Sequence, residues 1–169
     1  IEAENYEHAT RVIEEAKSLF PEAGRLNLLL ADLYYDKQLY ALALGEYQLA
    51  RAKQGEDFLL LSQIARSLGH LNREQESAAT LERLLELHPD SLSTIDDLGW
   101  MYFKTHQLEK GEALLLAALE EHGPDRGIYM TLGTIYSGLY DYQNARRFYL
   151  RAIDEARAAE DDYFASVAF

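Results

Sequence analysis

Self-similarity at a fixed period limits the fold of this chain most, because repeated units of this length stack on one another and share a continuous core. The interval is 34 residues, and it recurs without a gap. In each unit a Leu or Ile precedes a small residue, with a Tyr or Leu three positions later: Leu30-Ala31 with Tyr34, Ile64-Ala65 with Leu68, Leu98-Gly99 with Tyr102, and Leu132-Gly133 with Tyr136. A second series has a small residue followed four positions later by a bulky one: Ala43 and Tyr47, Ser77 and Leu81, Gly111 and Leu115, Ala145 and Tyr149.

Each series fits one face of a helix with 3.6 residues per turn, so every unit is expected to hold two helices. The small residue of the second series would let the second helix approach the first closely. Short polar turns separate the two patterns, for example Asp36-Lys37-Gln38 and Thr105-His106-Gln107. The unit is therefore predicted to be an antiparallel helix pair.

This spacing resembles the tetratricopeptide repeat, with four units at residues 24–57, 58–91, 92–125 and 126–159. Residues 1–23 match the second helix of a preceding partial repeat. Residues 160–169 are predicted to start a further helix, although a longer repeat or a continuing helix also fits them. Two polar residues, Asn27 and Ser77, depart from the family's pattern. The resemblance implies an all-α fold, a right-handed superhelical solenoid of antiparallel helix pairs.

No residue pattern points to an enzyme, a cofactor or a metal site. The five histidines show no ligand spacing such as His-Glu-x-x-His, and the chain has no cysteine. Asp96 and Asp97 are adjacent, so on a helix they point in different directions and cannot easily share a proton. Gly133 and Gly138 are five residues apart, as in a phosphate-binding loop, but no strand precedes them and no Lys-Ser or Lys-Thr follows them. Gly133 is therefore interpreted as a close-packing residue of the repeat.

Charge and hydropathy exclude two classes of partner. A formal net charge of -13 repels phosphate backbones, so nucleic acid is not expected. The longest apolar run, residues 113–119, is far shorter than the roughly 20 residues of a membrane span, so no membrane contact is expected from this segment. Without cysteine the compartment stays open between cytoplasm and periplasm. Because the chain does not start with Met and ends on apolar residues, we expect the parent array to continue at both ends.

The resemblance also implies a binding surface, since the family's concave face is lined by the first helix of each repeat. The candidate partner-binding residues at these positions are Leu28, Asp32, Tyr35, Leu59, Arg66, Asp96, Trp100, Phe103, Lys104, Met130 and Thr134. The family's clamp for a C-terminal carboxylate is not matched, because its positions hold Leu28 and Asp32. Trp100 is expected to share a face with Asp96 and Phe103 and to overlook the small side chains of Thr134, Ser137 and Gly138.

The predicted function is a non-catalytic protein–protein interaction scaffold that binds a segment of a partner protein in its concave groove. One alternative is a self-assembly module, in which exposed ends or second-helix faces join copies of the chain. Another is a scaffold in polysaccharide or envelope export, because grooves lined with Tyr and Trp also stack on sugar rings.

Overall fold

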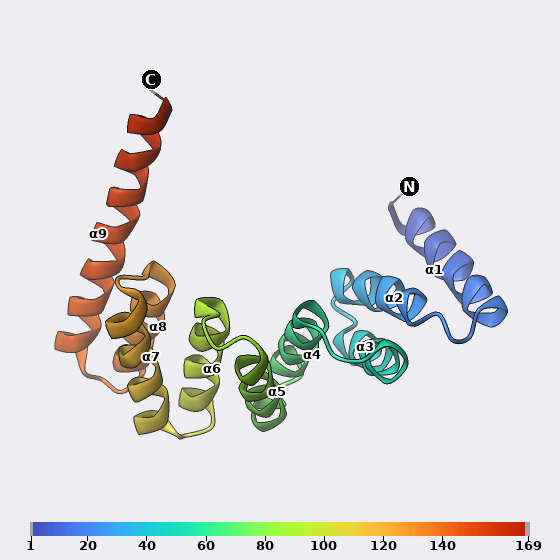
Figure 1. The fold of residues 1–169 in the computed structure, drawn as a ribbon, viewed down its shortest axis with the longest axis horizontal. Coiled ribbons are helices and arrows are strands. Elements are labelled where there is room, and N and C mark those ends of the chain that lie inside the picture. Colours follow the sequence, from blue (N-terminus) through green and yellow to red (C-terminus); the bar gives the residue numbers. More distant parts are fainter. Residues whose placement is uncertain (1, 168–169) are drawn as a thin grey trace. The chain divides into compact units, whose positions relative to one another are not determined.

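The computed structural model describes the backbone of residues 2–167 and the side chains of residues 5–159, and every regular element in this range is a helix. Figure 1 shows these helices in chain order. They are α1 (Glu2–Leu19), α2 (Gly24–Asp36), α3 (Tyr40–Gln54), α4 (Phe58–His70), α5 (Glu74–Leu87), α6 (Leu92–Lys104), α7 (Leu108–His122), α8 (Arg126–Gly138) and α9 (Tyr142–Val167). None of them is long and apolar enough to cross a membrane.

The same tight turn joins the helices of each pair α2–α3, α4–α5, α6–α7 and α8–α9. Its second residue has a positive φ in all four cases: Gln38, Asn72, His106 and Tyr140. The next residue donates its backbone N–H to a carbonyl five residues earlier, as Leu39 does to Tyr34 at 2.9 Å and Asp141 does to Tyr136 at 2.9 Å. This is the Schellman arrangement, which satisfies the last carbonyls of a helix and reverses the chain at once.

The chain consists of two compact units, Ile1–His88 and Pro89–Phe169. In the first unit a core of fully buried side chains joins α2, α3 and α4: Ala31, Ala43, Leu44, Tyr47, Ala50, Leu60, Ile64 and Leu68. In the second unit α6 to α9 bury Leu98, Leu115, Ile128, Leu132, Ile135, Phe148 and Ala152. Each unit therefore has apolar side chains packed within it.

Glycine permits the closest helix approaches in the second unit. A Cβ atom on Gly99 would lie 2.6 Å from Cγ of Leu115, and one on Gly133 would lie 2.6 Å from the ring of Tyr149. Both distances are shorter than van der Waals contact, so no side chain fits at either position without movement. Gly133 is thus the close-packing residue that its place in the repeat predicts.

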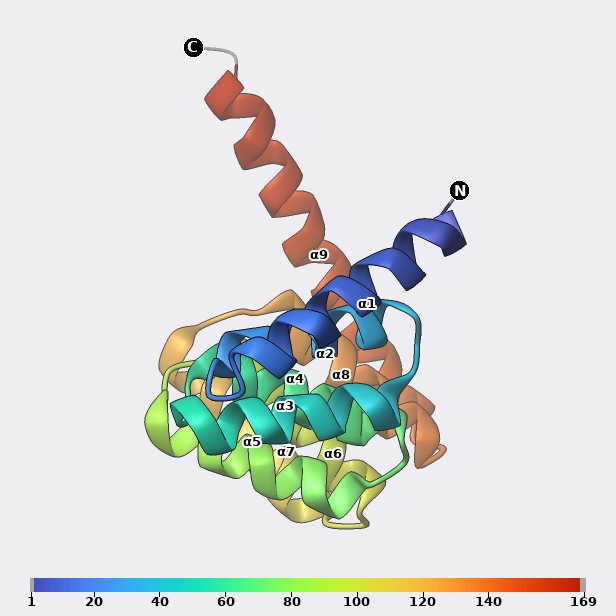
Figure 2. The same ribbon diagram turned by 90° about the vertical axis from the view of Figure 1, so that its right-hand side faces the viewer.

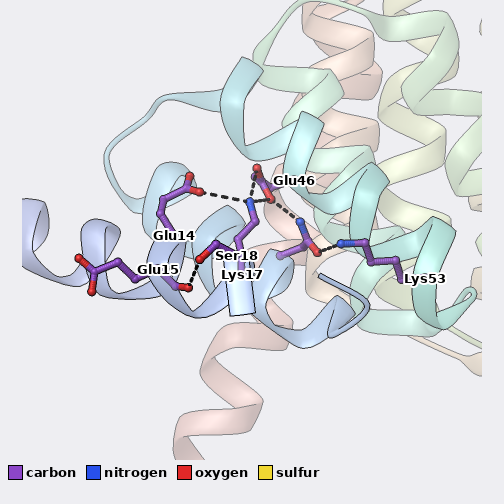
Figure 3. Close-up of polar contacts among 7 residues, drawn as sticks. Glu14, Glu15, Lys17, Ser18, Glu46 and Lys53 are labelled. Carbon is purple, nitrogen blue, oxygen red and sulfur yellow. Dashed lines mark hydrogen bonds and ion pairs between the residues drawn. The ribbon is translucent and has the colours of Figure 1, made fainter. Parts of the chain in front are cut away.

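A polar network ties α1 to the helices that follow it and explains the departure at Asn27 (Figure 3). Lys17 of α1 donates to both carboxylate oxygens of Glu46 on α3, each at 2.8 Å. Asn27 is completely buried; its amide nitrogen donates to Glu46 at 2.6 Å, and its oxygen accepts from Lys53 at 2.9 Å. The amide thus exchanges hydrogen bonds with two charged groups, which compensates for its burial.

The second departure, Ser77, is satisfied in a similar way. Its side chain is buried, and its hydroxyl donates to the backbone carbonyl of Ala65 at 2.9 Å. The side chain is small enough for α5 to pack close to α4, and its hydroxyl has an acceptor, so a polar residue replaces the family's usual Ala without leaving an unsatisfied polar group.

Helix α9 continues without a break through residue 160 and reaches Val167, as Figures 1 and 2 show. Residues 160–167 therefore extend the second helix of the last pair and do not start a further helix. Between Tyr142 and Val167 there is neither Gly nor Pro, so nothing in the backbone stops the helix. Residues 168 and 169 lie outside the described part of the chain.

Candidate functional site

The candidate residues fall on two surfaces, one in each unit, and we describe each surface by itself. The α2–α4 face comprises Leu28, Asp32 and Tyr35 of α2 with Leu59 and Arg66 of α4. The α6–α8 face comprises Asp96, Trp100, Phe103 and Lys104 of α6 with Met130 and Thr134 of α8. Their assignment to a binding site remains a prediction.

On the α2–α4 face the apolar candidates differ in how much they contribute to the core. Leu28 and Tyr35 are half-buried and pack against the core of the first unit. Leu59 is 68% exposed, and Arg66 is exposed as well. Leu59 is thus the apolar group on this face that the fold leaves in solvent.

Tyr35 belongs to an aromatic cluster with Tyr40 and His70. The rings of Tyr40 and His70 are stacked 4.0 Å apart with 5° between their planes, and both lie edge-on to Tyr35. Nε2 of His70 and the Tyr35 hydroxyl are 3.1 Å apart, within hydrogen-bond distance. The cluster holds the α2–α3 turn against the end of α4, so much of the Tyr35 ring is occupied by the fold.

Asp32 is also partly used by the fold, because it accepts a hydrogen bond from the second helix of its own pair. The hydroxyl of Tyr47, on α3, donates to Oδ1 of Asp32 at 2.6 Å. Burial and this hydrogen bond to a carboxylate raise the pKa of Tyr47 well above its usual range. Tyr47 is fully buried, and Asp32 supplies the acceptor that its hydroxyl needs.

The same pairing recurs in the last helix pair. There the Tyr149 hydroxyl and the Thr134 hydroxyl are 3.2 Å apart, and the two partners are again 15 positions apart in the sequence. The two remaining pairs have Leu81 and Leu115 in place of the tyrosine, and Arg66 and Trp100 in place of the polar partner. The sequence analysis missed this pairing, although the joint occurrence of Tyr and a small polar residue 15 positions earlier is visible in the sequence.

The α6–α8 face carries the one tryptophan of the chain. Trp100 and Phe103 are both half-buried, and their ring centroids are 5.3 Å apart with 31° between the planes. Phe103 lies against Gly138, where a Cβ atom would be 2.8 Å from Cζ of the ring. The small size of Gly138 therefore makes room for the ring of Phe103. We had expected Gly138 to lie beneath the indole of Trp100. Met130 is 46% exposed, and Lys104 is exposed in the last turn of α6.

Asp96 is half-buried on α6, where it faces the beginning of α8. The Thr131 hydroxyl donates a hydrogen bond to its carboxylate, but Oδ1 is buried without a hydrogen-bond partner. Burial raises the pKa of Asp96; the Thr131 bond opposes this shift, and the negative charges of Asp97 and Asp125 add to it. Thr131, Asp125 and Gly127 were not among the candidate residues, because their proximity to Asp96 depends on how α8 packs on α6.

The structure also brings together three exposed side chains that sequence spacing does not connect. The potential ligand atoms of Asp90, Glu121 and His122 all lie within 4.8 Å of one another. Exposed carboxylates of a chain with 29 acidic residues often gather without an ion, so we assign no metal to this cluster.

Comparisons with known proteins agree with the helix-pair architecture. Residues 127–158 match the family model of the tetratricopeptide repeat. Among curated proteins, none matches the sequence significantly.

Three solved structures illustrate the similarity in fold. The crystal structure of MamA is 16% identical, with a TM-score of 0.78 over 94% of this chain and 93% of that one. The crystal structure of YrrB, described as a TPR protein with an unusual peptide-binding site, is 18% identical, with a TM-score of 0.75 over 90% and 79%. A tetratricopeptide repeat protein from Parabacteroides merdae is 15% identical, with a TM-score of 0.80 over 92% and 62%. At these identities the likeness shows the fold: an all-α solenoid of the tetratricopeptide-repeat type.

Proposed function

We propose that this chain, which has the tetratricopeptide-repeat fold, is a non-catalytic scaffold that binds a segment of a partner protein. The fold supports the general class, because proteins built from this repeat are generally interaction scaffolds. The similar protein YrrB is described as having a peptide-binding site, which shows that the fold is compatible with peptide recognition. The finer proposal is that the partner segment lies on the α6–α8 face.

The observation that carries this proposal is the group of large apolar side chains that the second unit does not bury. Trp100 and Phe103 pack on each other and remain half-exposed, and Met130 on the neighbouring α8 is 46% exposed. Tryptophan is strongly enriched among residues that dominate binding energy, and methionine adapts its shape to different partners. A helical or extended segment with apolar anchors matches such a surface.

Trp100→Ala tests the proposal. Partners are first captured with the intact chain and mapped to a peptide, and affinity and thermal stability are then measured on parent and variant. We expect the affinity to fall by about 30-fold, which corresponds to about 2 kcal/mol, because a central aromatic anchor is lost. The melting temperature should change little, since the ring lies outside the packed core.

The matched control is Tyr142→Ala, which removes another exposed aromatic side chain, 64% exposed, from the beginning of α9. It should leave the affinity unchanged. If Trp100→Ala instead unfolds the second unit and shows no specific loss of affinity, Trp100 is a core residue and the proposed site is wrong.

Two other functions give different results in the same experiments. A self-assembly module would show a mass that rises with concentration in light scattering, and no foreign peptide would be mapped. A polysaccharide scaffold would bind glycans through Trp100 while capturing no protein.

A further inference from the structure

Helix α9 carries an exposed stripe of two aliphatic side chains between two arginines. The helix packs on α8 (Figure 1), for example through the ring of Phe148, which stacks on that of Tyr136 at 5.5 Å. Four exposed residues follow one another along another side of α9, at intervals of four, three and four positions, and so share a face. They are Arg146, Leu150, Ile153 and Arg157, and we call them the α9 stripe. Leu150 and Ile153 are 44% and 45% exposed, so the fold leaves both partly in solvent.

The fold makes little use of the charges of the stripe. Among the described residues Arg146 has no ion-pair partner, and Arg157 has Asp154 at 4.0 Å, with side chains 75% and 72% exposed. A pair as exposed as this contributes little to stability. In contrast, Arg51 of α3 and Arg83 of α5 both pair with Glu56.

The basic character of this part of α9 is also unusual within the chain. Residues 142–153 contain three arginines and no acidic residue, whereas the equivalent residues 74–85 and 108–119 contain three and two glutamates. The chain as a whole has a net charge of -13. Glutamates therefore suffice to keep the outer surfaces of α5 and α7 solvated, and solubility does not explain the arginines of α9.

In earlier pairs the same side of the second helix contacts the first helix of the next pair. Leu44 of α3, three repeats before Arg146, is buried in a core that includes Leu60 of α4. Glu112 of α7, one repeat before Arg146, accepts a hydrogen bond from the Tyr136 hydroxyl of α8. This side of a second helix is thus shaped to receive another α-helix.

No helix of the described chain occupies this position on α9. Helices α3, α5 and α7 end after 15, 14 and 15 residues, and the chain then turns into the next first helix. Helix α9 instead continues for 26 residues, as far as Val167 (Figure 2). Within the described residues the chain therefore does not return to cover the stripe.

The residues of the stripe indicate the chemistry of a helix that would fit there. Its apolar side chains would pack on Leu150 and Ile153, and carboxylates on either side of them would accept hydrogen bonds from the arginines. Arg146 and Arg157 are 11 positions apart, which is roughly 16 Å along α9, so the two carboxylates would be about three turns apart. The sequence becomes acidic at residues 160–162, and like charge disfavours contact with an acidic helix beyond the stripe.

An anionic membrane has the complementary charge as well, but it fits the stripe less well. A helix that lies on a membrane needs a broad apolar face, and the stripe has two aliphatic side chains. A bilayer also brings much of the acidic surface of the chain close to anionic lipids, which the net charge of -13 opposes. A single helix contacts α9 locally, within the roughly 8 Å over which charges act at physiological salt.

We propose that the α9 stripe is a second docking surface, which binds an amphipathic helix of a partner protein with carboxylates on either side of apolar residues. This inference goes beyond the function proposed above. The stripe and the α6–α8 face share no residue, and they would bind segments of different chemistry.

A displayed library of peptides of about 16 residues tests the proposal. Each peptide has an Ala-rich sequence that favours a helix, with random residues along one face. Selection uses the intact chain, and counter-selection uses the double variant Arg146→Glu/Arg157→Glu, whose melting temperature should match that of the parent because both side chains are exposed. We expect Glu or Asp to be enriched at two positions about three turns apart, with Leu or Ile between them.

The best peptide is then remade, and its affinity is measured for single variants. Arg146→Gln should weaken binding about fivefold, and Leu150→Gln about tenfold, because the first removes a charge pair and the second an apolar contact. The matched control is Arg151→Gln, which removes the same charge five positions later, roughly 140° around the helix. The guanidinium of Arg151 lies over the ring of Tyr129 at 5.8 Å, and its loss should change the affinity by less than about twofold.

Peptides without enriched acidic residues, or peptides that bind the parent and the double variant equally, overturn the proposal. A peptide that loses affinity with Trp100→Ala and keeps it with Arg146→Gln binds the α6–α8 face, which supports the proposed function and disproves the α9 surface. An Arg146-dependent peptide that Trp100→Ala does not affect supports the α9 surface, and the Trp100 experiment above then decides the proposed function separately.

Two further measurements test other occupants of the stripe. Phosphatidylserine vesicles that bind the parent and not the double variant would show that the stripe contacts membranes, contrary to the proposal. A mass that rises with concentration in light scattering for the parent, and not for the double variant, would show that a second copy of the chain occupies the stripe instead.

Discussion

Glycine has opposite effects at two helical positions of this chain. Gly133 of α8 lies against the ring of Tyr149, whose hydroxyl is 3.2 Å from that of Thr134 and so holds the ring in place. Gly45, in the interior of α3, is exposed, and a Cβ atom there would have no neighbour within 4 Å. The first glycine is required by packing, whereas the second only adds flexibility to the unfolded chain.

We therefore expect Gly133→Ala to destabilise the protein by about 1–3 kcal/mol through overpacking. Gly45→Ala should stabilise it by about 0.5–1 kcal/mol, because Ala is the better helix former. Thermal or urea unfolding of the two variants measures both effects. Equal changes in the two variants would show that Gly133 and Tyr149 do not pack as described.

Asp96 makes stability depend on pH in an unusual direction. Burial, together with the charges of Asp97 and Asp125, raises its pKa in the folded protein above the ordinary value of 3.8. In the interval between the two pKa values the folded state binds more protons than the unfolded state. Stability therefore falls as pH rises through this interval, and the ionised carboxylate costs stability at neutral pH.

Asp96→Asn should accordingly melt at a higher temperature than the parent near neutral pH. The difference should shrink below pH 3.8, where the parent carboxyl is protonated in both states. Asp154→Asn, compared over the same pH range, accounts for the general effect of removing one negative charge. An Asn variant that is less stable than the parent at neutral pH would contradict this account of Asp96.

At the scale of elements, a polar network helps to attach α1 to the helices that follow it. Lys17 and Glu46 are largely buried, with 17% and 15% of their side chains exposed, and Glu46 also accepts from Asn27. Glu46→Gln would leave the largely buried Lys17 ammonium with only the more distant, more exposed carboxylate of Glu14, at 3.9 Å, as its counter-charge. We expect a loss of about 1–2 kcal/mol and faster amide exchange in α1.

The exposed pair Arg73–Glu76 offers the control. Glu76→Gln removes the same charge from a pair at 2.6 Å whose side chains are 43% and 57% exposed, and it should change stability by less than about 0.5 kcal/mol. Hydrogen exchange then separates the two variants, because only Glu46→Gln should expose the amides of α1. If both variants leave α1 equally protected, the network does not hold the helix.

The repeat pattern predicts the elements well for a simple reason. Helical periodicity and small residues are local features, so they indicate paired helices, and α2, α4, α6 and α8 begin at Gly24, Phe58, Leu92 and Arg126. The end of α9 was harder to predict, because residues 160–167 hold no stop signal and three interpretations fitted them: a further helix, a longer repeat or a continuing helix. The hydrogen-bond partners of Asn27 could not be predicted either, since Glu46 and Lys53 lie on another helix, α3. Lys17 of α1 joins the network through Glu46.

The candidate site was less predictable than the helices for a related reason. Position within the repeat indicates on which side of a first helix a residue lies. It does not show which residues of the second helix or of the next repeat contact that side chain. Asp32 and Thr134 meet tyrosine hydroxyls, and Phe103 lies against Gly138. These contacts depend on how helices pack, because the residues that meet are 15 or more positions apart in the sequence.

At the scale of the whole molecule, the two units can be followed by different spectroscopic signals during unfolding. Residues 1–88 contain the core of α2, α3 and α4, together with the buried residues Ser77, Ala78, Leu81 and Leu84 of α5. Residues 89–169 contain the only tryptophan. Indole fluorescence therefore reports on the second unit alone, whereas circular dichroism reports on both.

We expect residues 1–88, produced without the rest of the chain, to be helical and to melt cooperatively, because their core contacts lie within this range and stability in repeat proteins is a sum of local terms. Residues 24–57 alone should be largely unfolded, since a single helix pair cannot bury its apolar face. Circular dichroism of the two fragments, compared with the intact chain, measures this. A fragment 1–88 without helical signal would mean that the first unit depends on residues beyond 88, and the division of the chain into two separately folding units would be wrong.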